Sequence, residues 1–552
     1  MGDIKMEMKP IIRFAGNVLA ERMGTVFSEN LADLRAKVDD GKGTFPRGFL
    51  HTSTVPHPGT CYYDQVWARD SGRGLQELAR WGFFSEALSV AEYLLSHKNF
   101  GDHWGRLVDR DIGVDYELDG NTHILNGIRQ TWIASGKDKA LGQRFLEGCM
   151  PVFHWFEKCM DECPIGDLIP CISELAGNPC ELIPVYAIYP NFGAYASVLG
   201  FVSLASDLGA EAEHAYLAAL ADRLKASLIP LLRSKGTDES PVPEGVWING
   251  RKEDGVPYET AHFGARFGIT HWTRQAPYGQ LFDIGVGFLP EDELKDVHLS
   301  SYRYLRHEMA KSPFFRKYGF VSNTCFGGSG GRHDDTMCGY GQNYFTQAAL
   351  MADDVNTYGL CLAGISRLAY DGDVVEPMAY EMNPWILHEC FSFENYEKGL
   401  DHTFGTFAVP EKGIADNDGD EGNLVQAAET LKTVAMTVGV SLENGVLTVC
   451  PRLPWEWNGM TLEDYPVTDS DGTVHRIGLS FVHDRAARTC SFCVFPSDGI
   501  KKARVRFGPF PCVLNTKNDL SGFTVERNET ASFLWSEEIP LTEDGGGTGI
   551  EL

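Results

Sequence analysis

Six short clusters along this 552-residue chain contain carboxylates, amides or arginines, and five of them also contain tryptophan or tyrosine. Carboxylates and amides form paired hydrogen bonds with vicinal hydroxyls, and an aromatic face covers the apolar C–H side of a pyranose ring. The mixture therefore predicts sugar binding. The candidate substrate-binding residues are Trp67, Arg69, Asp70, Glu117, Asp119, Asn121, Tyr189, Asn191, Trp272, Arg274, Tyr278, His333, Asp335, Tyr340, Gln342 and Asn423.

A second explanation applies to the acidic and amide members of these clusters. Asp and Asn at the start of a helix cap its free backbone N–H groups and interact well with its dipole. For a single residue such as Asp119 or Asn191, capping explains the residue type as well as substrate binding does. Tryptophan and arginine are not capping residues, so six such clusters still favour a binding site.

Carboxylates that could catalyse hydrolysis lie in two long stretches, 161–189 and 371–421. Cleavage of a glycosidic bond needs one protonated carboxyl group and one ionised carboxylate that activates water or attacks carbon. Glu174 and Glu389 have apolar sequence neighbours (PCISEL and WILHECF), and such surroundings raise a carboxyl pKa as an acid requires. The acidic stretch that ends at Glu421 is a further source.

Helical periodicity governs the first 440 residues and predicts the elements that position these side chains. Apolar residues recur on one face of each predicted helix. We expect helices at 12–36, 69–82, 85–97, 119–136, 138–160, 190–208, 210–234, 277–288, 291–311, 339–352, 355–370 and 422–439.

The links between these helices alternate between very short and very long. Short links force helices into antiparallel hairpins, and long loops in a compact domain are usually functional. The helices that follow a long loop begin at 69, 119, 190, 277, 339 and 422, and the helix 12–36 can supply the sixth outer partner. This arrangement predicts a mainly α fold, an (α/α)6 barrel of six helical hairpins with the clusters at one mouth. An open helical solenoid is the alternative, but no fixed repeat period supports it.

From residue 441 the pattern changes to short alternating runs separated by turn signals such as 443–445 (ENG). These runs predict a C-terminal antiparallel β-sandwich domain. We therefore expect a barrel domain at 1–440, a sandwich at 441–540 and a disordered tail at 541–552.

Several of these segments resemble known glycosidases. Residues 67–72 (WARDSG) with 82–87 (GFFSEA), and the segment 116–121 (YELDGN), resemble glucoamylase-type and debranching-type enzymes of the six-hairpin glycosidase superfamily. The order of barrel and sandwich, and residues 447–455 (LTVCPRLPW), resemble α-L-rhamnosidases. The chain lacks the Trp-Glu-Glu acid segment of the former and the Trp-Glu-Arg-Trp base segment of the latter.

The resemblance implies roles for particular residues. In those enzymes an Arg-Asp pair clasps sugar hydroxyls, which implies this role for Arg69 and Asp70. They place the general acid before the third inner helix and the base before the sixth. This implies Glu174 as acid and Glu389 as base, with Glu421 as the alternative base. Since the resembled enzymes mostly invert the anomeric configuration, inversion is expected here.

Composition excludes several classes of partner. A net charge of −28 repels nucleic acid and anionic membrane surfaces. The N-terminus lacks the apolar segment of a secretory signal, and no apolar run reaches the length of a membrane span. We therefore expect a cytoplasmic protein whose 14 cysteines are reduced and whose partner is a carbohydrate. Its oligomeric state stays open.

No motif indicates a metal or cofactor, and we expect neither, although a structural calcium site outside the EF-hand type stays open at 416–420. Residues 327–331 (GGSGG) have the spacing of a nucleophile elbow but lie between helical hairpins rather than in an α/β sheet. Cys490 and Cys493 form a single CxxC with no second pair to complete a zinc site. The segment 416–420 departs from an EF-hand loop in the position of its glycine.

The sequence thus predicts a glycoside hydrolase that acts on an oligosaccharide or a small glycoside by carboxylate acid/base catalysis, inverting and exo-acting. A sugar epimerase or isomerase, a glycoside phosphorylase and a non-catalytic carbohydrate-binding protein are the alternatives. The sugar, the linkage and the anomer stay open.

Overall fold

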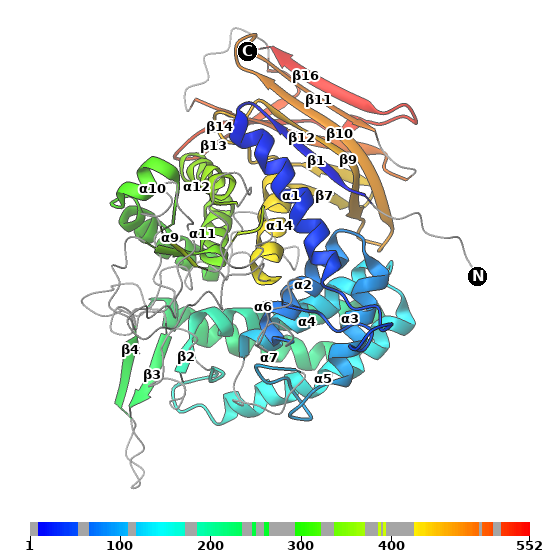
Figure 1. Cartoon of the computed structure of the whole chain (residues 1–552), viewed down its shortest axis with the longest axis vertical. Coiled ribbons are helices and arrows are strands. Elements are labelled where there is room, and N and C mark those ends of the chain that lie inside the picture. Colours follow the sequence, from blue (N-terminus) through cyan, green and yellow to red (C-terminus); the bar gives the residue numbers. More distant parts are fainter. Residues whose placement is uncertain are drawn as a thin grey trace.

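The computed structural model of the chain shows a helical part and a β-sandwich (Figure 1). It describes residues 9–52, 66–108, 118–171, 185–233, 245–249, 259–263, 293–321, 336–369, 385–387, 390–392, 424–495, 499–511 and 520–551.

The helical part is built from antiparallel hairpins. Gly82 and Gly209 adopt positive φ angles of 85° and 70° in two of the tight links, a conformation that glycine reaches without strain. The described helices are α1 (Val18–Ala36), α2 (Ala68–Arg80), α3 (Phe84–Ser96), α4 (Leu118–Ala134), α5 (Lys139–Asp161), α6 (Ile188–Leu208), α7 (Glu211–Arg233), α9 (Glu293–Met309), α10 (Pro313–Tyr318), α11 (Gly339–Met351), α12 (Val355–Leu368) and α14 (Leu424–Val438).

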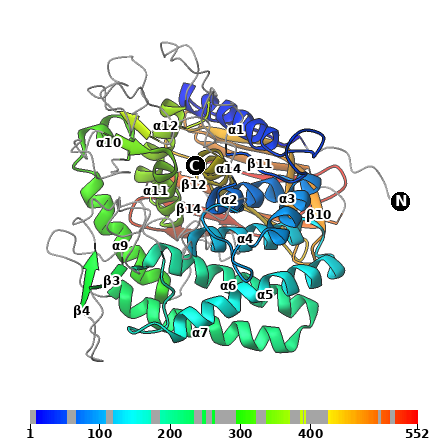
Figure 2. The same ribbon diagram turned by 60° about the horizontal axis from the view of Figure 1, so that its bottom comes forward.

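These helices form an inner and an outer layer (Figure 2). In α2, α4, α11 and α14 nearly every residue is buried, whereas α1, α3 and α7 bury only one face. The inner helices are neighbours in the order α6, α4, α2, α14 and α11, and α1 packs against α12 and α14. Helix α1 therefore supplies the outer partner that the sequence predicted for the N-terminal helix, although it begins at Val18 rather than residue 12.

Close contact between α2 and α4 depends on glycine. A Cβ atom on Gly72 would overlap the backbone of His123 and Ile124, and one on Gly127 would lie 2.8 Å from the carbonyl oxygen of Gly72. The two helices therefore touch backbone to backbone. Because Gly72 and His123 lie just beyond the first turns of their helices, this contact also holds the starts of α2 and α4 close together.

Small sheets join the long connections at the end where inner helices begin. Strand β2 (Val185–Ala187) directly precedes α6 and pairs with β3 (Gly245–Asn249), which pairs with β4 (Glu259–Phe263). Strand β5 (Thr336–Cys338) directly precedes α11 and pairs with β6 (Cys390–Ser392). The predicted loops therefore pair with one another beside the inner-helix N-termini, as the expected mouth requires.

The sandwich consists of two sheets. One has the order β1-β9-β10-β11-β16 and the other β13-β14-β12-β8-β7, with β15 beside β12. In β10 buried and less buried residues alternate, as expected for a strand with one face in a core. The pairs are antiparallel except for β8 with β12. The strands are β1 (Ile11–Ala15), β7 (Val440–Glu443), β8 (Val446–Val449), β9 (Gly459–Thr468), β10 (Val474–Asp484), β11 (Thr489–Phe495), β12 (Lys502–Phe510), β13 (Phe523–Arg527), β14 (Ser532–Ser536), β15 (Ile539–Pro540) and β16 (Gly546–Glu551).

Three expectations need correction. Residues 11–15 form β1, which pairs with β9, because Ile12 and Phe14 alternate inward between exposed neighbours. The tail is not disordered, since residues 546–551 form β16 against β11. Strands β2 to β6 and helix α10 occupy stretches expected to be loop. The predicted helix 277–288 lies outside the described residues.

A buried ionic cluster holds the two parts together. Asp353, in the link between α11 and α12, accepts a hydrogen bond of 3.0 Å from Arg506 of β12 and one of 3.1 Å from Asn528. Arg452 lies 3.6 Å from the same carboxylate. We call Asp353, Arg452, Arg506 and Asn528 the interdomain cluster. Burial alone would raise the pKa of Asp353, but the two guanidinium groups and the hydrogen bonds hold it below its ordinary value.

Within the described ranges, no helix combines the length and the apolar character needed to cross a bilayer.

Candidate functional site

Arg69 lies between two carboxylates at the mouth of the helical part. Its Nη2 is 3.3 Å from Oδ2 of Asp70, and its Nη1 is 3.9 Å from Oδ2 of Asp119. The side chains of Arg69, Asp70 and Asp119 are 11%, 2% and 9% exposed. Arg69 and Asp70 stand in the first turn of α2 and Asp119 in that of α4, so the contact of these helices brings them together. We call these three residues the mouth cluster.

The carboxylates of the mouth cluster are only partly neutralised by Arg69. Burial raises the pKa of Asp70, the neighbouring charge of Asp119 raises it further, and Arg69 offsets only part of this effect. Within the described part of the chain, Oδ2 of Asp70 and Oδ2 of Asp119 accept no hydrogen bond. A buried carboxylate oxygen without a donor is unfavourable, so both atoms are suited to accept hydrogen bonds from a ligand.

Tyrosines flank the mouth cluster. The guanidinium carbon of Arg69 lies 5.7 Å from the ring centroid of Tyr340, which belongs to the first turn of α11. Tyr189, in the first turn of α6, is hydrogen-bonded to His123 at 2.8 Å, and its ring centroid lies 6.2 Å from that of Tyr344. Burial lowers the pKa of His123 well below its ordinary value, and nearby Arg73, Lys432 and Arg69 lower it further. The imidazole is therefore neutral near pH 7.

A second polar layer lies one helical turn deeper. Arg73 pairs with Glu429 of α14, and Gln347 of α11 donates a hydrogen bond of 2.7 Å to the same carboxylate. All three side chains are buried. This layer links α2, α11 and α14 beneath the mouth cluster and fixes their relative rotation.

His123, Tyr344 and Arg73 were missed by the sequence reasoning. Each follows a predicted site residue by four positions, as in the pairs Arg69 and Arg73 or Asp119 and His123. Residues four apart lie on the same face of a helix. Continuing these clusters by one helical turn would therefore have indicated these three residues.

Three of the predicted amide side chains form hydrogen bonds with the backbone of the segment that precedes their helix. Asn121 accepts a hydrogen bond from the N–H of Trp104 and donates one to its carbonyl, at 3.0 and 2.7 Å. Asn191 does the same with Ile169, at 2.8 and 2.9 Å. Each amide is fully buried and is the fourth residue of its helix.

Gln342 repeats this arrangement as the fourth residue of α11. It accepts a hydrogen bond of 2.8 Å from the N–H of Val321 and donates to the carbonyls of Gly319 and Cys361. The three amides are therefore clamps that hold the outer-to-inner connections at the mouth. This is a correction to their expected contact with sugar, since their polar atoms bind backbone and they have no exposed surface.

Trp67 immediately precedes α2 and is half-buried. Its backbone forms an isolated bridge with Leu107, and its ring lies 6.0 Å from the guanidinium carbon of Arg106. It is therefore positioned beside the mouth cluster.

The remaining predicted site residues lie outside the described residues. They are Glu117, Glu174, Trp272, Arg274, Tyr278, His333, Asp335, Glu389, Glu421 and Asn423. Of the predicted set, the structure brings together Arg69, Asp70, Asp119, Tyr189 and Tyr340.

The described residues contain no group of three or more His, Cys, Asp or Glu side chains arranged to hold a metal ion. Cys490 and Cys493, which form the CxxC, are free thiols on β11.

Comparison with known proteins identifies the fold. No protein-family model and no curated protein sequence matches the chain. Among solved structures, the α-L-rhamnosidase of Dictyoglumus thermophilum is similar with a TM-score of 0.56 at 11% identity, over 99% of this chain and 50% of that one. The α-L-rhamnosidase of Streptomyces avermitilis, solved with L-rhamnose, gives 0.55 at 10% identity, over 99% and 43%. That of Aspergillus terreus gives 0.51 at 9% identity, over 99% and 50%.

The fold is therefore that of the six-hairpin glycosidases, shared with glycoside hydrolases at low sequence identity. This chain spans about half the length of the rhamnosidases that it matches.

Proposed function

We propose that this protein is a glycoside hydrolase that cleaves an oligosaccharide or a small glycoside. The observation that carries the proposal is the mouth cluster, in which buried Arg69 lies between Asp70 and Asp119. Two acceptor oxygens beside a guanidinium donor match a pair of vicinal sugar hydroxyls, each of which donates one hydrogen bond and accepts another. The fold supports the proposal, and the Streptomyces rhamnosidase with its bound L-rhamnose makes a deoxyhexose a reasonable first substrate to test.

The mouth cluster has a definite task in this proposal. It binds the sugar whose anomeric carbon reacts, and its low-polarity surroundings strengthen each hydrogen bond. Hydrogen bonds that strengthen as positive charge develops on the sugar ring lower the barrier more than the binding energy of the ground state.

Glu174 is our candidate general acid, and Glu389 our candidate base, with Glu421 as the alternative. The acid donates a proton to the leaving oxygen while the base removes one from the attacking water. Support for both base candidates comes from their sequence neighbours. Cys390, which follows Glu389, lies opposite Cys338 in the β5–β6 strand pair, beside the start of α11. Helix α14 begins at Leu424, three residues after Glu421.

A screen against aryl glycosides and oligosaccharides tests the proposal. It includes aryl α-L-rhamnosides, is run with and without phosphate, and follows the first-formed anomer by NMR. We expect phosphate-independent hydrolysis with inversion, and a loss of turnover in Glu174→Gln and in either Glu389→Gln or Glu421→Gln. Turnover that all three variants retain would refute the assignment, and a strict need for phosphate would make the protein a phosphorylase.

A further inference from the structure

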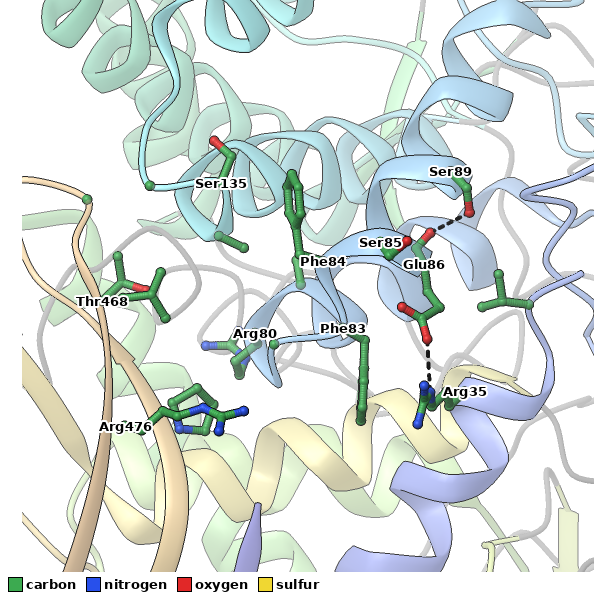
Figure 3. Close-up of a pocket in the computed structure, with 18 of the residues that line it drawn as sticks. Arg35, Arg80, Phe83, Phe84, Ser85, Glu86, Ser89, Ser135, Thr468 and Arg476 are labelled. Atoms are coloured by element: carbon green, nitrogen blue, oxygen red, sulfur yellow. Dashed lines mark hydrogen bonds and ion pairs between the residues drawn. The ribbon is translucent and has the colours of Figure 1, made fainter. Parts of the chain in front are cut away.

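A cavity lies away from the mouth cluster. It has a volume of about 1130 Å³ and is lined by the α2–α3 link, the α4–α5 link, the segment around 38–47 and the β9–β10 hairpin (Figure 3). Arg80, which lines it, is eleven residues after Arg69 on the same helix, so the two sites are about 16 Å apart along the helix axis. Both the helical part and the sandwich contribute to this interdomain pocket.

The interdomain pocket is preformed. A Cβ atom on Gly472 would lie 2.8 Å from the backbone of Gly136, so the two links meet at its edge. Beside this contact Lys137 donates hydrogen bonds of 2.7 Å to the carbonyl of Ser470 and to Asp207. The edge where helices meet the sandwich is thus held without a ligand.

The charges of the pocket are balanced in a chain whose net charge is −28. Four arginines and four carboxylates line it. Arg35 forms an ion pair of 2.9 Å with Glu86 (Figure 3), and Arg476 forms one of 3.1 Å with Asp464. A strongly anionic or cationic ligand would meet as many groups of its own sign as of the opposite sign. A neutral ligand with many donors and acceptors can use both.

Aromatic rings and hydroxyl groups complete the lining. Phe83 and Phe84 line the pocket at the start of α3; Phe83 is buried, and Phe84 is half-buried (Figure 3). Ser135 and Thr468 face the same space from the helical part and from β9. Flat apolar rings beside hydroxyls, carboxylates and guanidinium groups form a surface suited to a sugar ring.

We propose that the interdomain pocket is a second carbohydrate site that binds a neutral oligosaccharide segment. Its volume exceeds what a drug-sized ligand needs, so it has room for several linked rings rather than one monosaccharide. The two sites are separable by experiment, because hydrolysis depends on the mouth cluster and binding in the interdomain pocket does not. A chain held at this pocket would stay near the enzyme between cleavage events.

Calorimetric titration with defined tetrasaccharides tests the inference. The probes are maltotetraose, cellotetraose, xylotetraose and mannotetraose, with tetragalacturonate as the anionic comparison. The protein carries Arg69→Ala and Asp70→Asn, so that the mouth cluster contributes no binding. We expect at least one neutral probe to bind with a Kd of about 1 mM or tighter. Adding Phe84→Ala or Arg47→Ala should weaken this binding at least tenfold.

Matched controls are Phe495→Ala and Arg144→Ala, which alter exposed residues outside the pocket. Arg47 is exposed, so its variant reports on the pocket even where Phe84→Ala lowers the melting temperature. The inference fails if no neutral probe binds, if both pocket variants bind as the controls do, or if only tetragalacturonate binds. A failed hydrolysis screen would refute the proposed function and leave this titration unaffected.

Discussion

The mouth cluster and the interdomain cluster both bury arginine beside aspartate, yet the two carboxylates differ in their hydrogen bonds and in the direction of their pKa shifts. Asp353 accepts hydrogen bonds from Arg506 and Asn528, and its pKa lies below the ordinary value. Asp70 lies beside Arg69 with an oxygen that accepts no hydrogen bond from the described residues, and its pKa lies above the ordinary value. The first arrangement is complete within the protein, whereas the second leaves a buried acceptor oxygen without a donor among those residues, as the ligand-binding role that we propose requires.

This contrast distinguishes a structural ion pair from our proposed binding site without reference to sequence motifs. Removing a charge from a satisfied buried cluster leaves its partners uncompensated, which costs stability. Removing a charge from a cluster whose oxygens lack hydrogen-bond donors relieves an unfavourable burial. Such a variant should therefore lose function rather than stability. Substitutions at each cluster test this difference.

The largest stability effect is expected at the interdomain cluster. Asp353→Asn leaves Arg506 and Arg452 buried with less opposing charge, so the free energy of unfolding should fall by about 3–5 kcal/mol. Urea unfolding measures this loss. Asp464→Asn is the control, because its ion pair with Arg476 is about 28% exposed and should be worth about 0–1 kcal/mol. Equal losses in the two variants would contradict the structural role of Asp353.

The largest kinetic effect is expected at the mouth cluster. Arg69→Lys keeps the charge but loses the planar fork that reaches two partners. On a substrate found in the hydrolysis screen, kcat/KM should fall by about 10²–10³-fold, as when one transition-state donor is removed. Arg144→Lys, on the exposed face of α5, should leave it unchanged. Full activity in Arg69→Lys would show that the mouth cluster is not part of the active site.

An intermediate effect is expected at the amide clamps. Asn191→Leu keeps the volume of the side chain but deprives the backbone of Ile169 of both its partners, so stability should fall by about 1–3 kcal/mol. Gln143→Leu, an exposed amide of α5, should change it by less than about 0.5 kcal/mol. If Asn191 instead contacts sugar, the variant would lose substrate affinity at unchanged stability.

These clamps show how far the sequence could predict the molecule. The hairpins were predictable because apolar periodicity and link length are local, and so was the position of Arg69 and Asp70 at a helix start. The task of Asn121, Asn191 and Gln342 was not, because it depends on backbone from the segment that precedes each long connection. Strand β1 was missed for a similar reason, since its partner β9 lies more than 400 residues away.

The smallest effect is a pH dependence of opposite sign for the two aspartates. Because the folded pKa of Asp70 is raised, its contribution to stability is present below its unfolded value of 3.8 and is lost as pH rises through the folded pKa. Asp70→Asn should therefore gain on the wild type as pH rises. Because the pKa of Asp353 is lowered, its contribution is present above 3.8 and is lost as pH falls through the folded pKa.

Melting temperatures of wild type, Asp70→Asn and Asp353→Asn between about pH 3 and pH 8 measure both trends. A tenfold difference in proton affinity between the folded and unfolded states corresponds to about 1.4 kcal/mol of stability. Parallel curves for the two variants would show that the two carboxylates have the same kind of surroundings.

The unfolding free energy of Asp70→Asn at pH 7 is the most direct test that the mouth cluster is held ready for a ligand. It requires no substrate, and the two proteins compared differ only in the replacement of one carboxylate oxygen by an amide nitrogen. We predict that Asp70→Asn is at least as stable as the wild type in urea. A loss of about 3 kcal/mol, like that expected of Asp353→Asn, would make Asp70 a structural residue and contradict its role in ligand binding.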